Sequence, residues 1–489
     1  MIREWPVFSL FGKMLCVAGV IFLSACSTNP ATGESQFTAL MSPAQENQVG
    51  AQEHRKVMKI YGVPENSQVL QSYLNEVGQA VARNTERPDV RYTFTLLDSP
   101  MVNAFALPGG YVYVTRGLMA LANSEAELAG VIAHEIGHIT GRHSAERYSH
   151  AVVTSLGAIA ISAALDSNTA SQALGVGSEL YMSSYSRKQE AQADDLGIRY
   201  LHKAGYDTFA MASFLNSLDR ESNLNAAEKG QGSRGADYFA THPKTTDRVQ
   251  QALMVAGSYP ENQNLQRRNE YLQLLSGMAY GDSARQGFVR DLTFWHPQMD
   301  FTFTVPEGFS ISNQPSQVVA ASKNTGALII LDAVTNNRSL DAMTYLTEWL
   351  QGKPVEQTEA LEINGKSAAT ATLPGVVQGQ AVTIRLVAVN WAPGRVFRLQ
   401  MAIPQSAGSG LITELKRTTY SLRSMTDEER RSIRPLRIQV VMAKEGDTVA
   451  GMSSQMALDK NREECFRVLN GLEQGAGIVP NQLYKIITE

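Results

Sequence analysis

The spacing of hydrophobic positions changes along the chain, and this change predicts two differently built regions. Up to about residue 290, apolar residues recur mostly with the spacing of helices, in which positions i, i+3 and i+4 share one face. The pattern predicts helices from Ser42 toward Tyr61, from near Ser67, from Glu125 to about Thr140, over about 150–165 and over about 185–203. Tyr92–Leu97 alternates like a strand, and Asn103–Thr115 indicates a strand or a bent hairpin. Helices therefore predominate in the first region.

Beyond about residue 290, short alternating segments typical of strands become frequent. The pattern predicts strands over Phe301–Val305, Ala327–Val334, Val382–Trp391 and Val396–Ile403, and helices over about 340–351 and 408–422. The charged stretch from Thr426 to Arg434 is expected to be a linker, and a final segment of about 55 residues follows Pro435. The second region is therefore expected to mix strands and helices.

The first residues have the features of a bacterial signal peptide. Arg3 and Lys13 supply positive charge, and Met14–Ala25 is apolar but too short to span a bilayer comfortably. The run ends in Leu23-Ser24-Ala25-Cys26, which resembles a lipobox, whose cysteine is acylated and becomes the new N-terminus. An ordinary signal peptide with a chance cysteine is the alternative. We expect a signal peptide over 1–25, lipidation at Cys26, a tether over 26–40 and, by resemblance to lipoprotein sorting rules, anchoring to the outer membrane.

Composition and charge exclude several classes of protein. Of the 489 residues, 43% are hydrophobic and 18% charged, which excludes a disordered chain and permits a large core. A net charge of −4 makes a nucleic-acid partner unexpected. With three cysteines, neither a disulfide framework nor a cysteine-rich zinc module can form.

The residues His134-Glu135-Ile136-Gly137-His138 form an H-E-x-x-H motif within the helix predicted from Glu125. Histidines at i and i+4 project from one helix face, so both can bind one zinc ion. Glu135 lies beside them and can take a proton from a zinc-bound water. The alternative is two histidines on an ordinary amphipathic helix. The capping box of Ser124 and Glu127 and the apolar neighbours favour the zinc site.

A catalytic zinc site needs a third protein ligand, and two residues come into question. In metzincins a later histidine supplies it, but here Ser144 stands at that position and His143 comes one residue early. We expect His143 to be a surface group or to lie behind a ligand. Glu190, on a later helix, suits a site with two histidines and one glutamate, and Asp194 can fix the tautomer of a ligand histidine. A solvated acidic helix face is the alternative.

Three further segments of the sequence resemble known motifs, in addition to the H-E-x-x-H motif. They are Asn103–Gly110, similar to N-A-F-A-x-P-G-G; Glu190–Asp194, similar to E-x-x-A-D; and Thr241-His242-Pro243, followed by Arg248. Together the four segments resemble the M48 family of zinc metallopeptidases, in its bacterial lipoprotein form, over about 40–280. The resemblance implies a mainly helical, gluzincin-type metallopeptidase domain with a small sheet over 41–288. It also implies one Zn²⁺ per chain, held by His134, His138 and Glu190.

The resemblance implies roles for the other segments as well. His242 and Arg248 are similar to family residues near the active site, and we expect them to stabilise the oxyanion. His242 can instead be a fourth zinc ligand in a resting, closed state, or a capping histidine before Pro243. An edge strand beside the cleft would accept an extended peptide through main-chain hydrogen bonds, and this strand comprises Asn103, Ala104, Phe105 and Ala106. Such binding predicts broad specificity for unfolded or extended polypeptide.

The C-terminal segment over 435–489 resembles a LysM module, a βααβ unit that binds N-acetylglucosamine chains. The resemblance rests on Gly446-Asp447-Thr448-Val449, on Val468–Leu472 and on Pro480-Asn481-Gln482, where Asn481 replaces the usual glycine. It implies contact with peptidoglycan, whereas a protein-contact or capping module is the alternative. Residues 289–425 are expected to form a small α+β domain of unknown role, so the whole chain belongs to the α+β class.

These features together predict a lipid-anchored periplasmic zinc endopeptidase that cleaves unfolded or misfolded envelope proteins, outer-membrane proteins among them. The role in protein quality control rests on the family resemblance. One rival is a chaperone-like periplasmic protein that binds polypeptide in the same cleft with little turnover. Another is a peptidoglycan-associated factor in which the LysM-like end dominates. The intact Glu135 favours catalysis, because a binding cleft needs the metal ligands at most.

Overall fold

A computed structural model describes residues 26–64, 67–164, 184–228, 238–243, 247–260, 263–377 and 379–489. The predicted signal peptide and the side chain of Cys26 lie outside the described part. The chain folds into two compact units. Unit 1 comprises the residues up to Leu97, Val102–Leu218 and Tyr238–Leu274, and unit 2 comprises Asp98–Met101, Asp219–Asp237 and Leu275–Glu489. The expected subdivision into 41–288, 289–425 and 435–489 stays a prediction.

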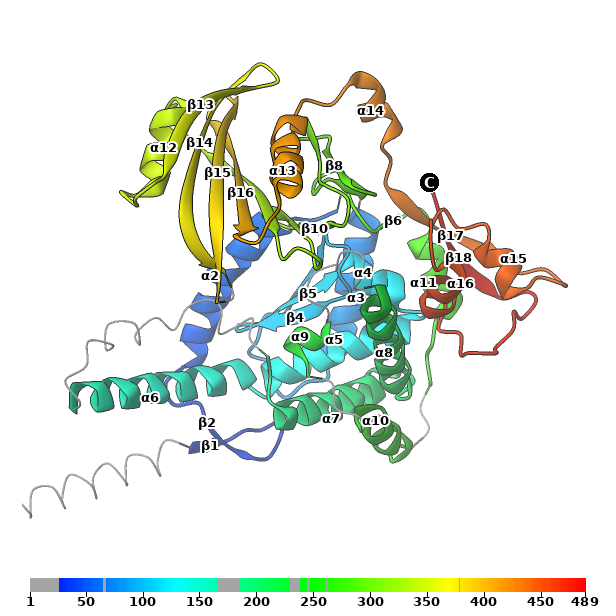
Figure 1. The fold of residues 1–489 in the computed structure, drawn as a ribbon. Coiled ribbons are helices and arrows are strands. Elements are labelled where there is room, and N and C mark those ends of the chain that lie inside the picture. Colours follow the sequence, from blue (N-terminus) through cyan, green and yellow to red (C-terminus); the bar gives the residue numbers. More distant parts are fainter. Residues whose placement is uncertain are drawn as a thin grey trace, which may run out of the picture. The chain divides into compact units, whose positions relative to one another are not determined.

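Helices make up most of unit 1, as the spacing of its apolar residues predicts (Figure 1). The helices are α2 (Pro43–Ile60), α3 (Gln68–Ala82), α4 (Arg116–Leu121), α5 (Glu125–Thr140), α6 (His143–Ala164), α7 (Arg187–Ala204), α8 (Ala210–Glu228), α9 (Tyr238–Thr241), α10 (Arg248–Gly257) and α11 (Arg268–Leu275). From Asp219 onward α8 belongs to unit 2, as does the last residue of α11. Capping boxes begin α2 at Ser42 and α7 at Ser186, and both are visible in the sequence. No described helix has the length and apolar character needed to cross a membrane.

The strands of unit 1 form a hairpin and one small sheet. Strands β1 (Cys26–Thr28) and β2 (Ser35–Phe37) pair with each other. The sheet has the order β3-β5-β4, with β3 (Thr93–Leu97), β4 (Ala104–Leu107) and β5 (Tyr111–Thr115). Strand β5 pairs parallel with β3 and antiparallel with β4, so β3 and β4 are the two edges. The segment 103–115 is thus a hairpin with its turn at Pro108–Gly110.

Helices α5 and α7 pack closely, and two glycines make this possible (Figure 1). A methyl group on Gly137 would lie 2.9 Å from the carbonyl oxygen of Ala193, and one on Gly197 would lie 3.1 Å from the backbone nitrogen of His134. These distances leave little or no room for a side chain at either position. The close approach brings the H-E-x-x-H residues of α5 next to the side chains of α7.

Unit 2 contains a seven-stranded antiparallel sheet with the order β10-β11-β12-β16-β15-β14-β13. Its strands are β10 (Ser310–Gln314), β11 (Gln317–Ala321), β12 (Leu328–Thr335), β13 (Gln357–Ile363), β14 (Lys366–Val377), β15 (Gln380–Ala392) and β16 (Arg395–Pro404). Alternate residues of β15 face opposite sides, as in any strand. Val387 and Val389 belong to the core under α13 (Ser409–Ser421), and Leu386 and Ala388 to the core under α12 (Ala342–Leu350). The sheet is therefore covered on both faces.

Two smaller sheets complete unit 2. Strands β7 (Phe288–Arg290), β8 (Thr293–His296) and β9 (Phe301–Thr304) form one, and three of their phenylalanines join the core under α13. The other has the order β18-β17-β6, with β6 (Ala279–Tyr280), β17 (Leu436–Met442) and β18 (Leu483–Thr488). Helices α15 (Val449–Ser453) and α16 (Arg462–Leu469) lie between β17 and β18 in the chain, so this segment has the expected βααβ order. Its identity as a LysM-like module stays a prediction.

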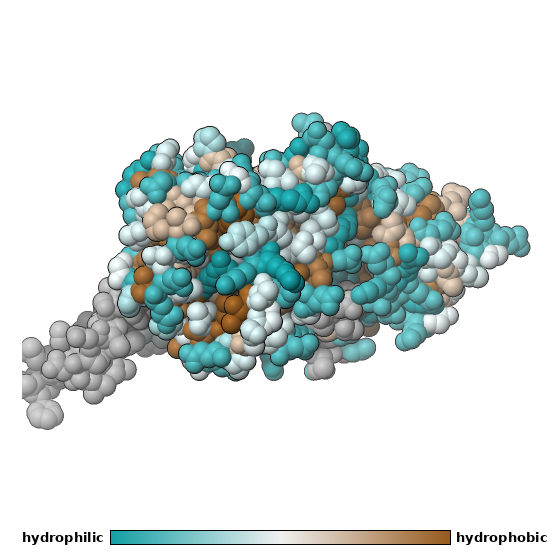
Figure 2. Space-filling view, turned by 45° about the horizontal axis from the view of Figure 1, so that its top comes forward, coloured by the Kyte–Doolittle hydropathy of each residue, from teal (hydrophilic) through white to brown (hydrophobic). Residues whose placement is uncertain are grey.

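The structure confirms an α+β fold and differs from the sequence prediction in detail. The expected linker 426–434 contains a short helix, α14 (Asp427–Ser432), because Thr426 and Glu429 form a capping box. On the face shown in Figure 2, hydrophilic residues predominate and the hydrophobic ones form small separate areas. Scattered apolar residues of this kind mark no binding site by themselves.

Candidate metal centre

Helix α5 presents the two histidines of the H-E-x-x-H motif on one face inside unit 1. Ser124 caps the helix by accepting a hydrogen bond from the backbone N–H of Glu127, as the sequence predicts. His134 and His138 are buried, and their Nε2 atoms lie 3.1 Å apart. The helix thus holds two imidazole nitrogens at one point, one turn apart along its axis.

Glu190 and His242 complete a group of four potential metal ligands with the two histidines. One donor atom of each residue lies within 4.8 Å of the others, and all four side chains are buried. Nδ1 of His242 lies 3.3 Å from Nε2 of His134 and 3.0 Å from Oε1 of Glu190, which is 3.4 Å from Nε2 of His138. Donors bound to one tetrahedral zinc at about 2.0–2.1 Å are about 3.3 Å apart. The four residues therefore fit a zinc ion in both chemistry and spacing.

A metal binds neutral imidazole and ionised carboxylate, and the electrostatics of His138 and Glu190 favour these forms. His134 differs, because burial alone would lower its pKa but the neighbouring Asp194 raises it. Burial lowers the pKa of His138 well below its usual value. Burial alone would raise the pKa of Glu190, but the neighbouring His242 and His138 hold it well below the usual range. Both side chains are therefore ready to bind a cation without first losing a proton.

Asp194 and Arg248 stand behind the ligands. Oδ1 of Asp194 lies 2.8 Å from Nδ1 of His134, which leaves Nε2 of that ring directed at the other donors. Arg248 donates two hydrogen bonds to Asp194, at 2.9 and 2.8 Å, and its Nη1 lies 2.8 Å from Oε2 of Glu190. Burial alone would raise the pKa of Asp194, but Arg248 and His134 hold it below its usual value. Arg248 thus pairs with both carboxylates, balances one of their two negative charges and fixes their orientation.

His138 is oriented by two residues to which the sequence gives no clear role. Its Nδ1 lies 2.8 Å from Nδ1 of His143, and Nε2 of His143 lies 3.1 Å from Oε1 of Gln192. The Gln192 oxygen can only accept, so His143 donates from Nε2 and accepts at Nδ1. His138 then donates from Nδ1 and keeps a lone pair on Nε2. His143 is therefore buried behind a ligand, whereas Gln192 could be found only from the packing of α6 against α7.

Glu135 differs from every other carboxylate of the centre. It is fully buried, and neither carboxylate oxygen makes a hydrogen bond in the described part of the chain. Its Oε1 lies 3.4 Å from Nε2 of His242. Burial raises the pKa of Glu135, although the charges of His242 and His134 oppose this shift. A carboxylate without partners next to a metal-ligand group is free to exchange a proton.

Aromatic rings cover the centre. The ring of Tyr185 stacks on His138 with centroids 3.6 Å apart, and the ring of Tyr238 stacks on His242 at 4.2 Å. Both tyrosines are buried, and Tyr238 belongs to the short helix α9 that precedes His242. In this arrangement the four ligands and Glu135 are shielded from solvent.

Comparison with known proteins gives these residues a context. A family profile described as Peptidase family M48 matches residues 68–255, which include the four ligands and Glu135. The chain carries a zinc metallopeptidase domain of family M48. The chain is 35% identical over 204 residues to a putative beta-barrel assembly-enhancing protease of Vibrio cholerae, covering 40% of this chain and 41% of that protein.

Two further relatives come from Escherichia coli and Schizosaccharomyces pombe. The chain is 31% identical over 180 residues to metalloprotease YcaL of Escherichia coli, covering 36% of this chain and 66% of that protein. It is 26% identical over 246 residues to mitochondrial metalloendopeptidase OMA1 of Schizosaccharomyces pombe, covering 49% of this chain and 69% of that one. The chain spans less than half the length of the beta-barrel assembly-enhancing proteases of Vibrio cholerae and Escherichia coli.

The outer edge of strand β4 lies next to the centre and is unpaired but buried, since the exposed fractions of Ala104 and Ala106 are 0% and 3%. Thr115 N–H donates to the Asn103 carbonyl at 3.0 Å, which places residues 103, 105 and 107 in the hydrogen-bonded positions against β5. The N–H and C=O groups of Ala104 and Ala106 therefore point away from β5. Within the described residues they make no hydrogen bond on that side. Ala106 and His138 line the same crevice, so the free edge lies beside a metal ligand.

The sequence therefore anticipates most of this arrangement. The structure brings together His134, Glu135, His138, Glu190, Asp194, His242 and Arg248, and sets the strand of Asn103, Ala104, Phe105 and Ala106 beside them. The individual roles of these residues are proposals. Tyr185 and Gln192 have no recognisable signal in the sequence, because an aromatic or amide residue near a motif is common.

Proposed function

We propose that this protein is a zinc endopeptidase that cleaves unfolded or misfolded polypeptides of the bacterial envelope. The observation that carries the proposal is the group of four donors beside a buried carboxylate without partners. Zinc bound there lowers the pKa of a water and polarises the scissile carbonyl. His134, His138 and Glu190 would hold the ion, and Asp194 and His143 keep the two imidazoles oriented.

Glu135 acts as the general base. Its free carboxylate takes a proton from the attacking water and later passes it to the leaving amine. Such a step needs a carboxylate that is not already committed to another partner, and no hydrogen bond in the described structure engages Glu135. Burial, which raises its pKa, brings it closer to the range in which a carboxylate gives a proton back.

His242 is proposed to occupy the fourth ligand position in the closed state. Its Nδ1 lies as close to Glu190 and His134 as the three expected ligands lie to one another. An oxyanion role remains the competing proposal. If His242 is a resting ligand, His242→Ala opens the position for water and raises peptidase activity. If it binds the oxyanion, the same variant loses about 10²–10³ in rate while zinc content is unchanged.

Arg248 is proposed to act as a positioning residue in the closed state. Its side-chain hydrogen bonds and ion pairs in the described part of the chain are to Asp194 and Glu190, so its charge is engaged behind the ligands. The role predicted from the sequence, direct stabilisation of the oxyanion, would require these contacts to open. Arg248→Lys tests this point, because a lysine keeps the charge but cannot reproduce the paired hydrogen bonds. Weaker zinc retention in that variant supports positioning, and unchanged zinc with slower turnover supports oxyanion binding.

The substrate class follows from the free edge of β4. Main-chain groups of Ala104 and Ala106 can pair with an extended polypeptide, and such pairing selects unfolded segments with little regard to sequence. The envelope setting is inferred from the names of the beta-barrel assembly-enhancing proteases and from the lipobox. Outer-membrane proteins are therefore the proposed substrates. Lipidation at Cys26 and a periplasmic location are part of the same proposal; Cys26→Ser should release the protein from membranes.

The proposal is tested by comparing envelope proteins in cells that make the wild type or the Glu135→Gln variant. The variant keeps the ligands and the β4 edge and removes the base, so substrates should accumulate only with the variant. Identical envelope compositions would contradict the proposal and favour the chaperone-like alternative, which needs no base. A loss of peptidoglycan binding on deletion of 435–489, with no change in proteolysis, would instead assign that segment to the wall.

A further inference from the structure

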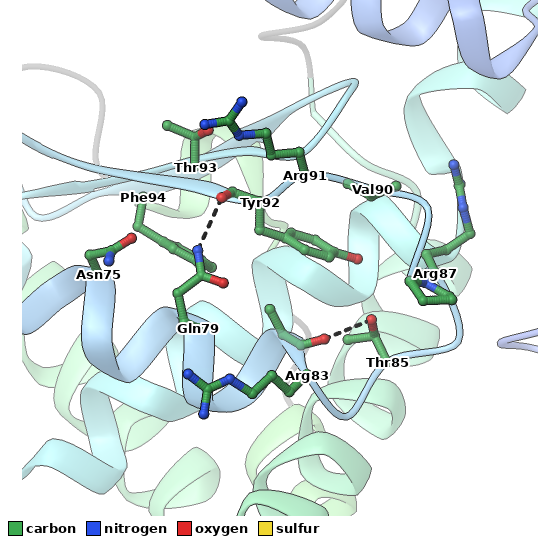
Figure 3. A pocket seen from close by; sticks show the side chains of 12 residues that line it. Asn75, Gln79, Arg83, Thr85, Arg87, Val90, Arg91, Tyr92, Thr93 and Phe94 are labelled. Atoms are coloured by element: carbon green, nitrogen blue, oxygen red, sulfur yellow. Dashed lines mark hydrogen bonds between the residues drawn. The ribbon is translucent and has the colours of Figure 1, made fainter.

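A groove of about 650 Å³ lies on unit 1 between the end of α3 and the segment that leads into β3 (Figure 3). None of the residues of the metal centre lines it. The lining residues are Asn75, Gln79, Ala82, Arg83, Thr85, Arg87, Pro88, Val90, Arg91, Tyr92, Thr93 and Phe94. The groove is therefore a separate feature of the M48 domain.

The charged side chains that line this groove are all positive. Its lining contains three arginines and no carboxylate. Arg87 is buried and bound to Asp89, which lies outside the lining, with Nη2 2.9 Å from Oδ2. Arg83 and Arg91 are exposed, and neither makes an ion pair or side-chain hydrogen bond with a described residue. Two positive charges without partners thus face solvent at the groove.

The groove also has unused hydrogen-bonding capacity. The Tyr92 hydroxyl is buried and makes no hydrogen bond of standard geometry. Gln79 donates one hydrogen bond to the Tyr92 carbonyl at 3.1 Å, and in Figure 3 it lies between Arg83 and Arg91. The two free charges therefore stand on either side of a polar floor, an arrangement that suits a ligand with several acceptor groups.

Two residues join this groove to the crevice at the metal centre. Arg87 and Val90 line both the groove and the crevice that contains His138 and Leu107. The hydrogen bond from Thr93 N–H to the Gly110 carbonyl, at 2.8 Å, ties the groove wall to the turn after β4. A chain that leaves the β4 edge near this turn thus reaches the groove directly.

We propose that the groove binds an acidic segment of the polypeptide substrate, at a distance from the bond that is cleaved. The proposal rests on the proposed function, because it assumes that an extended polypeptide lies along β4. Arg83 and Arg91 attract aspartate and glutamate side chains, and the Gln79 amide can pair with main-chain or carboxylate oxygens. The enzyme then prefers acidic polypeptides, although the β4 edge itself reads only main chain.

Continuity with the crevice favours a polypeptide over other anionic ligands. An anionic membrane surface would also be attracted to Arg83 and Arg91, but it would not need a groove that leads to His138. The two ligand classes give different results in the experiment below.

The experiment measures kcat/KM for peptides that share one cleavable centre and carry four acidic, four amide or four lysine residues on one side. A second set carries the same blocks on the other side. The variants are the double substitution Arg83→Gln, Arg91→Gln and, as control, Arg55→Gln, Lys59→Gln, which removes two exposed charges from α2. All four positions are exposed, so both variants should fold. Binding of each peptide to Glu135→Gln is measured by fluorescence anisotropy.

For one placement of the block, the wild type should cleave the acidic peptide about fivefold more efficiently than the amide peptide, since each exposed ion pair contributes little. The difference should lie in KM, disappear in about 0.5 M salt and disappear in the groove variant, but persist in the control. Equal kcat/KM for acidic and amide peptides in both placements would overturn the proposal and leave the peptidase function standing.

If no peptide is cleaved but Glu135→Gln binds the acidic peptide more tightly through the two arginines, the peptidase function fails and the groove proposal stands. Vesicles of phosphatidylcholine with phosphatidylglycerol test the other ligand class, using protein without its lipid anchor. Binding to these vesicles that depends on Arg83 and Arg91, without any preference among peptides, would overturn the proposal in favour of a membrane surface.

Discussion

The two outer edges of the β3-β5-β4 sheet differ in their hydrogen bonding. The outer edge of β3 is closed by side chains of α3. Gln71 donates from Nε2 to the Phe94 carbonyl at 2.8 Å and accepts from the Leu96 N–H at 2.9 Å, as a neighbouring strand would do. Gln79 occupies the Tyr92 carbonyl in the same way. The outer edge of β4, in contrast, keeps its main-chain groups free.

This difference shows how a small sheet can offer one edge for binding without offering the other. An open edge is a liability, because any extended chain can pair with it. Here α3 removes the liability on the side that lies away from the metal ligands. The edge that stays unpaired is buried in this structure and lies in the crevice with His138. An extended chain can pair with it, beside the metal centre, only after the covering side chains move apart. The sheet therefore directs an extended chain to one site.

The largest effect is expected from removing a metal ligand beside the β4 edge. Glu190→Gln replaces a ligand oxygen and a charge, and leaves Arg248 with Asp194 alone. We expect weak zinc retention and a loss of activity of more than about 100-fold. Metal analysis after dialysis, together with an assay on labelled unfolded polypeptide, checks both. Full zinc content and full activity would remove Glu190 from the ligand set.

A proline in β4 removes a hydrogen-bond donor from the unpaired edge itself. The N–H of Ala106 points away from β5, so Ala106→Pro removes a donor from the free edge and none from the ladder. We expect kcat/KM for extended peptides to fall about tenfold, in line with one lost hydrogen bond and a crowded approach. Ala106→Ser, which keeps the N–H, is the matched control. An equal fall in both variants would show that the side chain matters and the main chain does not.

A change at the closed edge should affect stability and leave catalysis intact. Gln71→Ala leaves the Phe94 carbonyl and the Leu96 N–H without partners, which should cost about 1–3 kcal/mol in the free energy of unfolding. Gln79→Ala removes a single hydrogen bond and should cost less, about 0.5–1.5 kcal/mol. Denaturant unfolding measures both, and peptide kinetics should match the wild type for Gln71→Ala. Slower cleavage in that variant would mean that the β3 edge contributes to substrate binding.

Much of this comparison could be predicted from the sequence, because local patterns determine the relevant elements. The capped, apolar helix around His134 begins and ends where the pattern predicts, and the segment 103–115 is a hairpin. The closing of β3 could not be predicted. It depends on the distance between α3 and β3, and glutamines on a half-exposed helix face are common in proteins. The parallel pairing of β3 with β5 is likewise set by tertiary contacts.

The metal centre can likewise be predicted only in part from the sequence. The ligand helix and its Glu135 follow from one motif. Glu190 reaches the motif only because α5 and α7 pack through Gly137 and Gly197, and His242 comes from the end of α9, far away in the sequence. The contact of His143 with His138 depends on how the chain turns between α5 and α6. Sequence spacing shows that His143 is misplaced as a metzincin ligand, but it cannot show the ring pairing.

The proposed function depends on two properties of the metal centre: the four donors hold zinc, and Glu135 acts as the general base. The most direct test measures zinc content and turnover of an unfolded polypeptide on the same sample of Glu135→Gln. We expect about one zinc per chain, as in the wild type, and a turnover that is lower by a factor of about 10²–10⁴. Wild-type turnover with zinc in place would contradict the role of Glu135, and loss of zinc from this variant would make Glu135 part of the metal site.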